Sequence, residues 1–107
     1  MKALLLISAV VLGAHLSAMA AESVDYLREI KPLLKSRCYA CHGALKQKTE
    51  LRLDTGAAIR RGSKNGPVVL TNAVAKSPLL LRVASTNRDE RMPAEGEALT
   101  PQQIALL

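Results

Sequence analysis

The chain has 107 residues, a formal net charge of +6, two cysteines and neither Phe nor Trp. A single small domain of this length buries little apolar surface, so a staple or a cofactor is expected to complete its core. The basic residues are scattered rather than gathered in one run, which argues against nucleic-acid binding and is typical of a solvated surface.

Residues 1–20 have the pattern of a secretory signal peptide. Lys2 supplies the positive start, Ala3–Ala14 is apolar, and Ala18–Ala20 fits the small-x-small cleavage pattern. The apolar run is shorter than the roughly 20 residues that a membrane span needs. We therefore predict cleavage before Ala21, export to the periplasm and no stable membrane span afterwards. An uncleaved N-terminal membrane anchor is the alternative.

The first predicted element after this leader is a helix that leads to Cys38. Ser23 can cap its first turn. Its apolar residues recur every three or four positions, as on one face of a helix: Val24, Leu27, Ile30 and Leu34. Pro32 lacks a backbone donor, so we expect a kink there or a helix that restarts near Lys31.

From Gly43 to Asn72 the pattern is irregular and predicts long loops. Within it, Thr55 to Arg61 can form a short helix that Gly62 ends, and residues 63–67 are rich in turn formers. The alternation over residues 51–54 is too short to establish a strand. The apolar residues 68–70 are expected to cover an edge of the core.

Two further helices are predicted in the last third. Ser77 precedes Pro78, the usual order of a cap and a first-turn proline, and an apolar helix follows. After the polar loop 87–91, Thr100 begins a last helix in which Gln103 can complete a capping box. Because isolated helices this short are marginal, we expect the chain to be a fragment whose last helix originally continued. The predicted fold class is all-α.

The most informative motif is residues 38–42, Cys-Tyr-Ala-Cys-His, the c-type haem attachment pattern. The thiols of Cys38 and Cys41 can add to the two vinyl groups of one haem, and His42 is then placed to bind the iron. A disulfide between such close cysteines would stabilise little, and a thioredoxin-like motif expects a βαβ pattern that is missing here. We therefore predict one covalent haem c.

Met92 is the candidate for the second axial position on the iron. Outside the predicted leader, His42 is the only histidine and Met92 the only methionine, so two histidine ligands from one chain are excluded. A thioether suits haem iron, and Pro93 restricts the backbone that presents it. The alternatives are a core role for Met92, a distal lysine and an open sixth position.

With these segments in view, the chain resembles the planctomycete-type cytochrome c domain. Five segments carry the resemblance in order, beside the haem motif itself: Ile30–Leu34, Lys46–Asp54, Ser77–Val83, Met92–Leu99 and Thr100–Leu107. The resemblance implies a small all-α domain over residues 21–107, wrapped around one covalent haem and forming the N-terminal module of a larger exported protein.

For the site, the resemblance implies thioethers at Cys38 and Cys41, a proximal ligand at His42 and a distal ligand at Met92. Three replacements depart from the family pattern: Thr49-Glu50 for paired glycines, Thr71-Asn72 for a Pro-Gly turn, and Ala94 for a second proline. The tryptophan-containing continuation of the family's last helix is also missing, which again indicates a domain incomplete at its C-terminus.

The expected function is that of an exported mono-haem electron carrier rather than an enzyme. Basic residues around the haem edge would steer acidic redox partners toward it. The alternative is an electron-relay module of a larger fused or partner periplasmic enzyme, in which further domains of the same chain follow.

Overall fold

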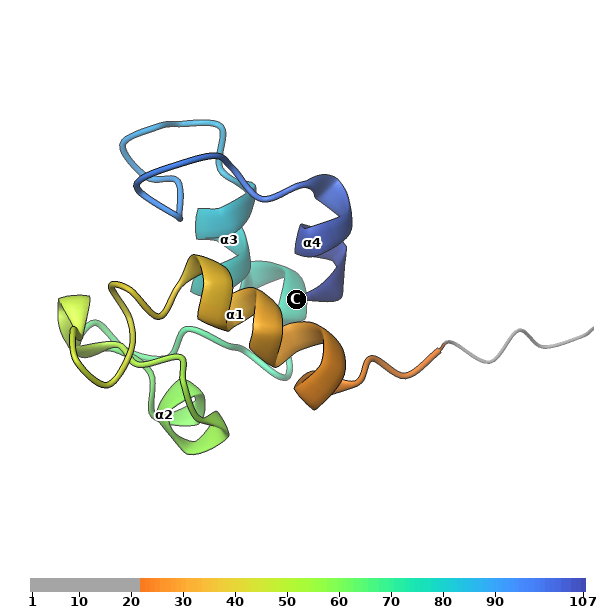
Figure 1. The fold of residues 1–107 in the computed structure, drawn as a ribbon, viewed down its shortest axis with the longest axis horizontal. Helices are drawn as coiled ribbons and strands as arrows, with labels where there is room; N and C mark the ends of the chain where they lie inside the picture. Colours follow the sequence, from red (N-terminus) through yellow and green to blue (C-terminus); the bar gives the residue numbers. More distant parts are fainter. Residues whose placement is uncertain (1–21) are drawn as a thin grey trace, which may run out of the picture.

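The computed structural model of this chain describes residues 22–107 (Figure 1). The predicted signal peptide and its cleavage position lie outside that range. The described part is mostly helical and holds no strand, as the all-α class requires. Its helical segments in chain order are η1 (Tyr26–Ile30), α1 (Lys31–Arg37), η2 (Lys48–Glu50), α2 (Gly56–Arg61), η3 (Val74–Lys76), α3 (Pro78–Ala84) and α4 (Pro101–Leu106).

The first helix begins later than predicted. Asp25, not Ser23, is the N-cap: its carboxylate accepts the N–H of Arg28, and its own N–H donates to the side chain of Glu29. These two bonds satisfy the backbone N–H groups of Asp25 and Arg28, which have no acceptor within the helix. The helix is therefore capped at Asp25, and the predicted cap at Ser23 is wrong. The π-helical η1 then gives way to α1 at Lys31, which confirms the predicted restart.

The other predicted helix ends are mostly confirmed. Thr55 caps α2, and Gly62, with φ at 78°, ends it. The capping box of α4 is complete, with Thr100 and Gln103 bonded in both directions. Ser77 stands at the predicted N-cap of α3, but its hydroxyl accepts the backbone N–H of Leu70 at 2.9 Å instead. That bond ties the preceding loop to α3.

The core consists of two hydrophobic clusters. The helical cluster is built on buried Leu33, Val83 and Leu99 from α1, α3 and the segment before α4, with four partly buried neighbours: Leu80, Met92, Ile104 and Leu107. The loop cluster is built on buried residues of the central segment, Leu51, Leu53 and Val68, with four partly buried neighbours: Cys38, Tyr39, Ile59 and Leu79. The predicted edge role of residues 68–70 is thus confirmed for Val68.

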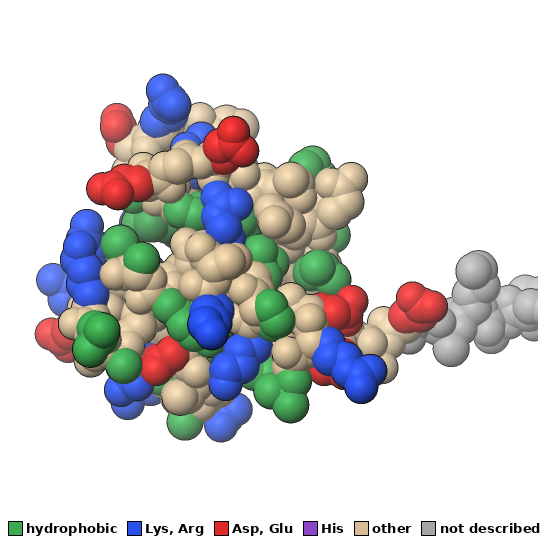
Figure 2. Space-filling view, in the orientation of Figure 1, with side chains coloured by type: hydrophobic (Ala, Val, Ile, Leu, Met, Phe, Trp, Pro, Cys, Tyr) green, Lys and Arg blue, Asp and Glu red, His purple; other side chains and the backbone are tan. Residues whose placement is uncertain are grey.

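The outer surface carries charges of both signs. In Figure 2 the blue and red side chains are interspersed on the visible face, in agreement with the scattered charge of the sequence. The same view shows a recess between the loop that follows α3 and the part of the chain that follows α1, which Figure 1 shows on the left. Among residues 22–107, no helix is both long enough and apolar enough to cross a membrane.

Leu53 offers a test of this packing, because only 2% of its surface is exposed and it lies in the loop cluster. We predict that Leu53→Ala lowers the free energy of unfolding by about 2–5 kcal/mol, since it leaves a cavity. Leu45→Ala is the matched control, because Leu45 is fully exposed. Guanidinium titrations followed by circular dichroism measure both. Equal effects of the two substitutions would contradict the described core.

Candidate haem-binding site

The haem attachment motif forms a tight turn at the end of α1. The N–H of Cys38 donates to the carbonyl of Leu34 at 2.8 Å, and the N–H of His42 donates to the carbonyl of Cys38 at 2.8 Å. Both cysteines are partly buried free thiols. The structure therefore brings Cys38, Cys41 and His42 together on one turn, with no disulfide between the cysteines.

The imidazole of His42 has a defined orientation. Its Nδ1 lies 3.1 Å from the carbonyl oxygen of Lys48. A carbonyl can only accept, so Nδ1 carries the proton and Nε2 keeps a free lone pair. Histidines that bind metals are commonly held in this way, with the second ring nitrogen bonded to a carbonyl or carboxylate. The ring is thus prepared to bind an iron atom through Nε2.

Backbone bonds hold the Lys48 carbonyl against the motif. The N–H of Lys48 donates to the carbonyl of Cys41 at 2.9 Å, and the N–H of Leu53 donates to the carbonyl of His42 at 2.9 Å. Thr49 and Glu50, in η2, both have positive φ values, of 56° and 57°. These are the two positions at which the resemblance led us to expect glycines, and the left-handed turn forms here with other residues.

Burial raises the pKa of the Cys38 thiol above its ordinary value, and the nearby Arg37 guanidinium opposes this only in part. A redox-active cysteine of the thioredoxin kind needs the opposite shift, because the thiolate is the reactive form. Cys38 instead packs as a neutral sulfur against the loop cluster. This environment suits a thioether beside an apolar group better than thiol–disulfide exchange.

Met92 lies on a different segment, the loop that follows α3, as predicted. Its N–H donates to the carbonyl of Arg82 at 3.0 Å, which fixes the loop to the end of α3. The side chain is half-buried and packs against the helical cluster. The structure thus places the haem motif beside the loop cluster and Met92 beside the helical cluster. A core role was the alternative to ligation for Met92, and its packing against the helical cluster agrees in part with that alternative.

Arg37 joins these two halves of the site. Its guanidinium donates to the backbone carbonyl of Glu97, a residue 60 positions later in the chain. Arg37 directly precedes Cys38, and Glu97 closes the loop that begins at Met92. One side chain therefore connects the residue next to the first attachment cysteine with the loop that bears the candidate second ligand.

Three buried polar atoms lack hydrogen-bond partners among residues 22–107: the hydroxyls of Tyr26 and Tyr39 and Nε of Arg91. Tyr39 lies between the two attachment cysteines, and Arg91 directly precedes Met92. Burial is also the main cause that raises the pKa of the Tyr39 phenol. Buried donors without acceptors are uncommon and call for an explanation. A group with apolar faces and acidic substituents would supply the missing acceptors.

Neither Tyr26 nor Arg91 was predicted as a site residue from the sequence. Tyr26 is one of only two tyrosines in a chain without Phe or Trp, and Arg91 is the neighbour of the candidate ligand Met92. These two facts were weak indications in the sequence that both residues could belong to the site. Neither residue type has a fixed spacing from the haem motif that could have singled it out.

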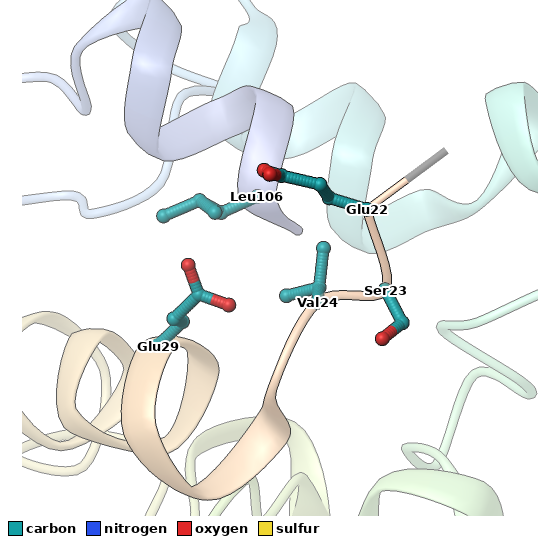
Figure 3. Close-up of a pocket in the computed structure, with 5 residues that line it drawn as sticks. All are labelled: Glu22, Ser23, Val24, Glu29 and Leu106. Atoms are coloured by element: carbon teal, nitrogen blue, oxygen red, sulfur yellow. The ribbon is translucent and has the colours of Figure 1, made fainter. Parts of the chain in front are cut away.

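Two surface cavities lie in the described part of the chain, and neither is lined by His42 or Met92. One, of about 350 Å³, is lined by residues of the haem motif, by the residues that follow it up to Leu45 and by Asp54. The other, of about 480 Å³, lies between the N-terminal segment and the end of α4 (Figure 3). Its lining includes the carboxylates of Glu22 and Glu29 and none of the predicted site residues.

The fold and the site together define a class of protein. A small helical chain with two free thiols and an oriented histidine in the order Cys-x-x-Cys-His has the features of a c-type cytochrome. The family described as planctomycete cytochrome C matches residues 38–96, and the chain belongs to this family. The matched range contains Cys38, Cys41, His42 and Met92.

No curated protein and no solved structure matches the chain. The family of cytochromes c consists of haem-binding electron carriers, and haem c is therefore the implied cofactor. The residues present fit this group. Two free thiols, an imidazole with an available Nε2 and unpartnered buried donors are the side chains that a covalent porphyrin with two propionates can use.

The left-handed turn at η2 provides a test of how the His42 contact is held. We predict that Thr49→Gly raises the free energy of unfolding by up to about 1 kcal/mol, because a residue with a Cβ is strained at positive φ. The matched control is Ala57→Gly in α2, which should lower stability by about 0.5–1 kcal/mol. Thermal unfolding of both variants measures the difference, and destabilisation by Thr49→Gly would contradict the described turn.

Proposed function

We propose that this chain is a mono-haem c-type cytochrome domain that exchanges single electrons with other proteins. In this proposal Cys38 and Cys41 hold the haem through thioethers, His42 is the proximal ligand and Met92 is the distal ligand. The observation that carries the proposal is the contact of His42 Nδ1 with the Lys48 carbonyl, which leaves Nε2 free to bind iron.

The chain's own residues have separate tasks in this function. The bound haem supplies the one-electron chemistry. Lys48 orients the imidazole through its carbonyl, and the loop fixed at Arg82 and Glu97 presents the thioether of Met92. Ligation by methionine and histidine raises the reduction potential of haem iron. In this proposal the helical and loop clusters pack against the haem and keep water away from it.

Two observations support Met92 as the distal ligand. It is the only methionine among residues 22–107, and its loop is joined to the haem motif by Arg37. With both axial positions filled, the iron offers no free position for a substrate. We therefore propose an electron carrier rather than an enzyme, exported to the periplasm behind the signal peptide of residues 1–20.

The second candidate function is an electron-relay module for an enzyme, either fused to this domain or bound to it. The resemblance to an N-terminal module of larger exported proteins favours it. Mixed surface charge with a formal excess of Lys and Arg favours acidic redox partners in either case. The DNA downstream of Leu107 distinguishes a free carrier from such a module.

The covalent link is tested on protein matured in a host that attaches haem c. We predict that haem stays with the protein band on a denaturing gel and adds its mass to the chain, because both sulfurs form thioethers. His42→Ala should abolish stable holoprotein. Two titratable thiols in a colourless wild-type product would contradict the proposal.

The distal ligand is tested by Met92→Leu, which keeps the packing against the helical cluster but removes the sulfur. We predict loss of the methionine-to-iron charge-transfer absorption and a lower reduction potential, because the thioether favours the reduced iron. Leu80→Met is the control, since it changes a side chain of the same cluster without touching the loop. An unchanged absorption spectrum in Met92→Leu would remove Met92 from the site.

A further inference from the structure

The guanidinium nitrogens of Arg91 lie in different environments. One terminal nitrogen of its guanidinium donates to the carbonyl of Gly96 at 3.2 Å, at the exposed rim of the Met92 loop. Its Nε is buried and has no hydrogen-bond partner within residues 22–107. The side chain thus bonds to the other end of the loop through a terminal nitrogen, while its Nε is a buried donor without an acceptor.

The positive charge of Arg91 is also not neutralised in the described part of the chain. The two ion pairs found there join Arg28 to Asp25 and Arg52 to Asp54, and Arg91 takes part in neither. The glutamates at positions 90, 95 and 97 are close in sequence, but they are exposed and none of them forms an ion pair with Arg91. A buried donor without an acceptor is costly, so an acceptor from outside the polypeptide belongs beside Nε, and the unpaired charge of the guanidinium favours an anion there.

The position of Arg91 suggests the source of that anion. Consecutive Cα atoms are about 3.8 Å apart, so a group bound at Met92 lies within reach of the preceding side chain. Haem carries two propionates at one edge. A carboxylate accepts well from the side of a guanidinium, where Nε–H and a terminal N–H point in nearly the same direction.

We propose that Arg91 is a positioning residue that binds a haem propionate through Nε, while its contact with Gly96 braces the loop of the axial ligand. This inference rests on the proposed function, because it requires the haem and its ligation by Met92. It assigns a role to the one buried donor next to the iron ligand. A single arginine then couples the orientation of the haem edge to the placement of the thioether.

The coupling has an electrostatic consequence. A fixed positive charge beside the propionate offsets its negative charge and disfavours the ferric state. Arg91 should therefore raise the reduction potential beyond the effect of the axial ligands. The exposed Arg88, which lies in the same polar loop, should contribute less because solvent screens its charge.

The test uses the matured holoprotein and three variants. Arg91→Met removes the charge and the donor, Arg91→Lys keeps the charge but removes Nε, and Arg88→Gln removes an exposed charge from the same loop. The first readout is the propionate bending band in the resonance Raman spectrum, which responds to hydrogen bonding at the carboxylate. The second is the reduction potential, measured by spectroelectrochemistry at high and low ionic strength.

We expect the propionate band to shift in both Arg91 variants and to stay unchanged in Arg88→Gln. The potential should fall clearly in Arg91→Met and much less in Arg91→Lys. A wild-type band in Arg91→Met would overturn the inference even if the methionine charge-transfer absorption weakened, because Arg91 would then only brace the loop. Equal falls of potential in Arg91→Met and Arg88→Gln would also overturn it. A wild-type protein without covalent haem would instead refute the proposed function itself.

Discussion

The contact between His42 Nδ1 and the carbonyl of Lys48 is the interaction on which the site depends. It selects the tautomer in which Nε2 can bind iron and sets the plane of the ring. The carbonyl is held in place by backbone bonds to the motif itself and by a left-handed turn at Thr49 and Glu50. The irregular segment after the motif therefore has a structural task, because its turn supplies the carbonyl that bonds to the imidazole of His42.

A second constraint is that the site is divided between two hydrophobic clusters. The attachment motif contacts the loop cluster, and Met92 contacts the helical cluster. Arg37 links the halves through Glu97. In a chain with two tyrosines as its only aromatic residues, a porphyrin between the clusters would supply the large apolar surface that the side chains lack. In our proposal the acidic edge of this porphyrin faces the buried Nε of Arg91, which has no partner among residues 22–107.

Much of this architecture could be predicted from local sequence signals. Gly62, Thr100 and Gln103 act within one turn of their own positions, so the ends of α2 and α4 were predictable. Ser77 was predicted correctly as the N-cap residue of α3, but its side chain does not cap the helix, because it accepts the N–H of Leu70 from the preceding loop. Asp25 rather than Ser23 is the cap, since two residues that can both cap a helix lie only two positions apart. The contact of Arg37 with Glu97 joins residues 60 positions apart, and the burial of Arg91 Nε results from tertiary packing, so no local pattern encodes either.

The central claim to test is that His42 Nε2 and the sulfur of Met92 bind one iron atom. X-ray absorption at the iron edge of the matured, ferrous protein tests this most directly, because it counts the atoms bound to the metal. The account predicts one sulfur and five nitrogens around the iron, and loss of the sulfur alone in Met92→Leu. Six nitrogen ligands, or a vacant sixth position in the wild-type protein, would contradict it.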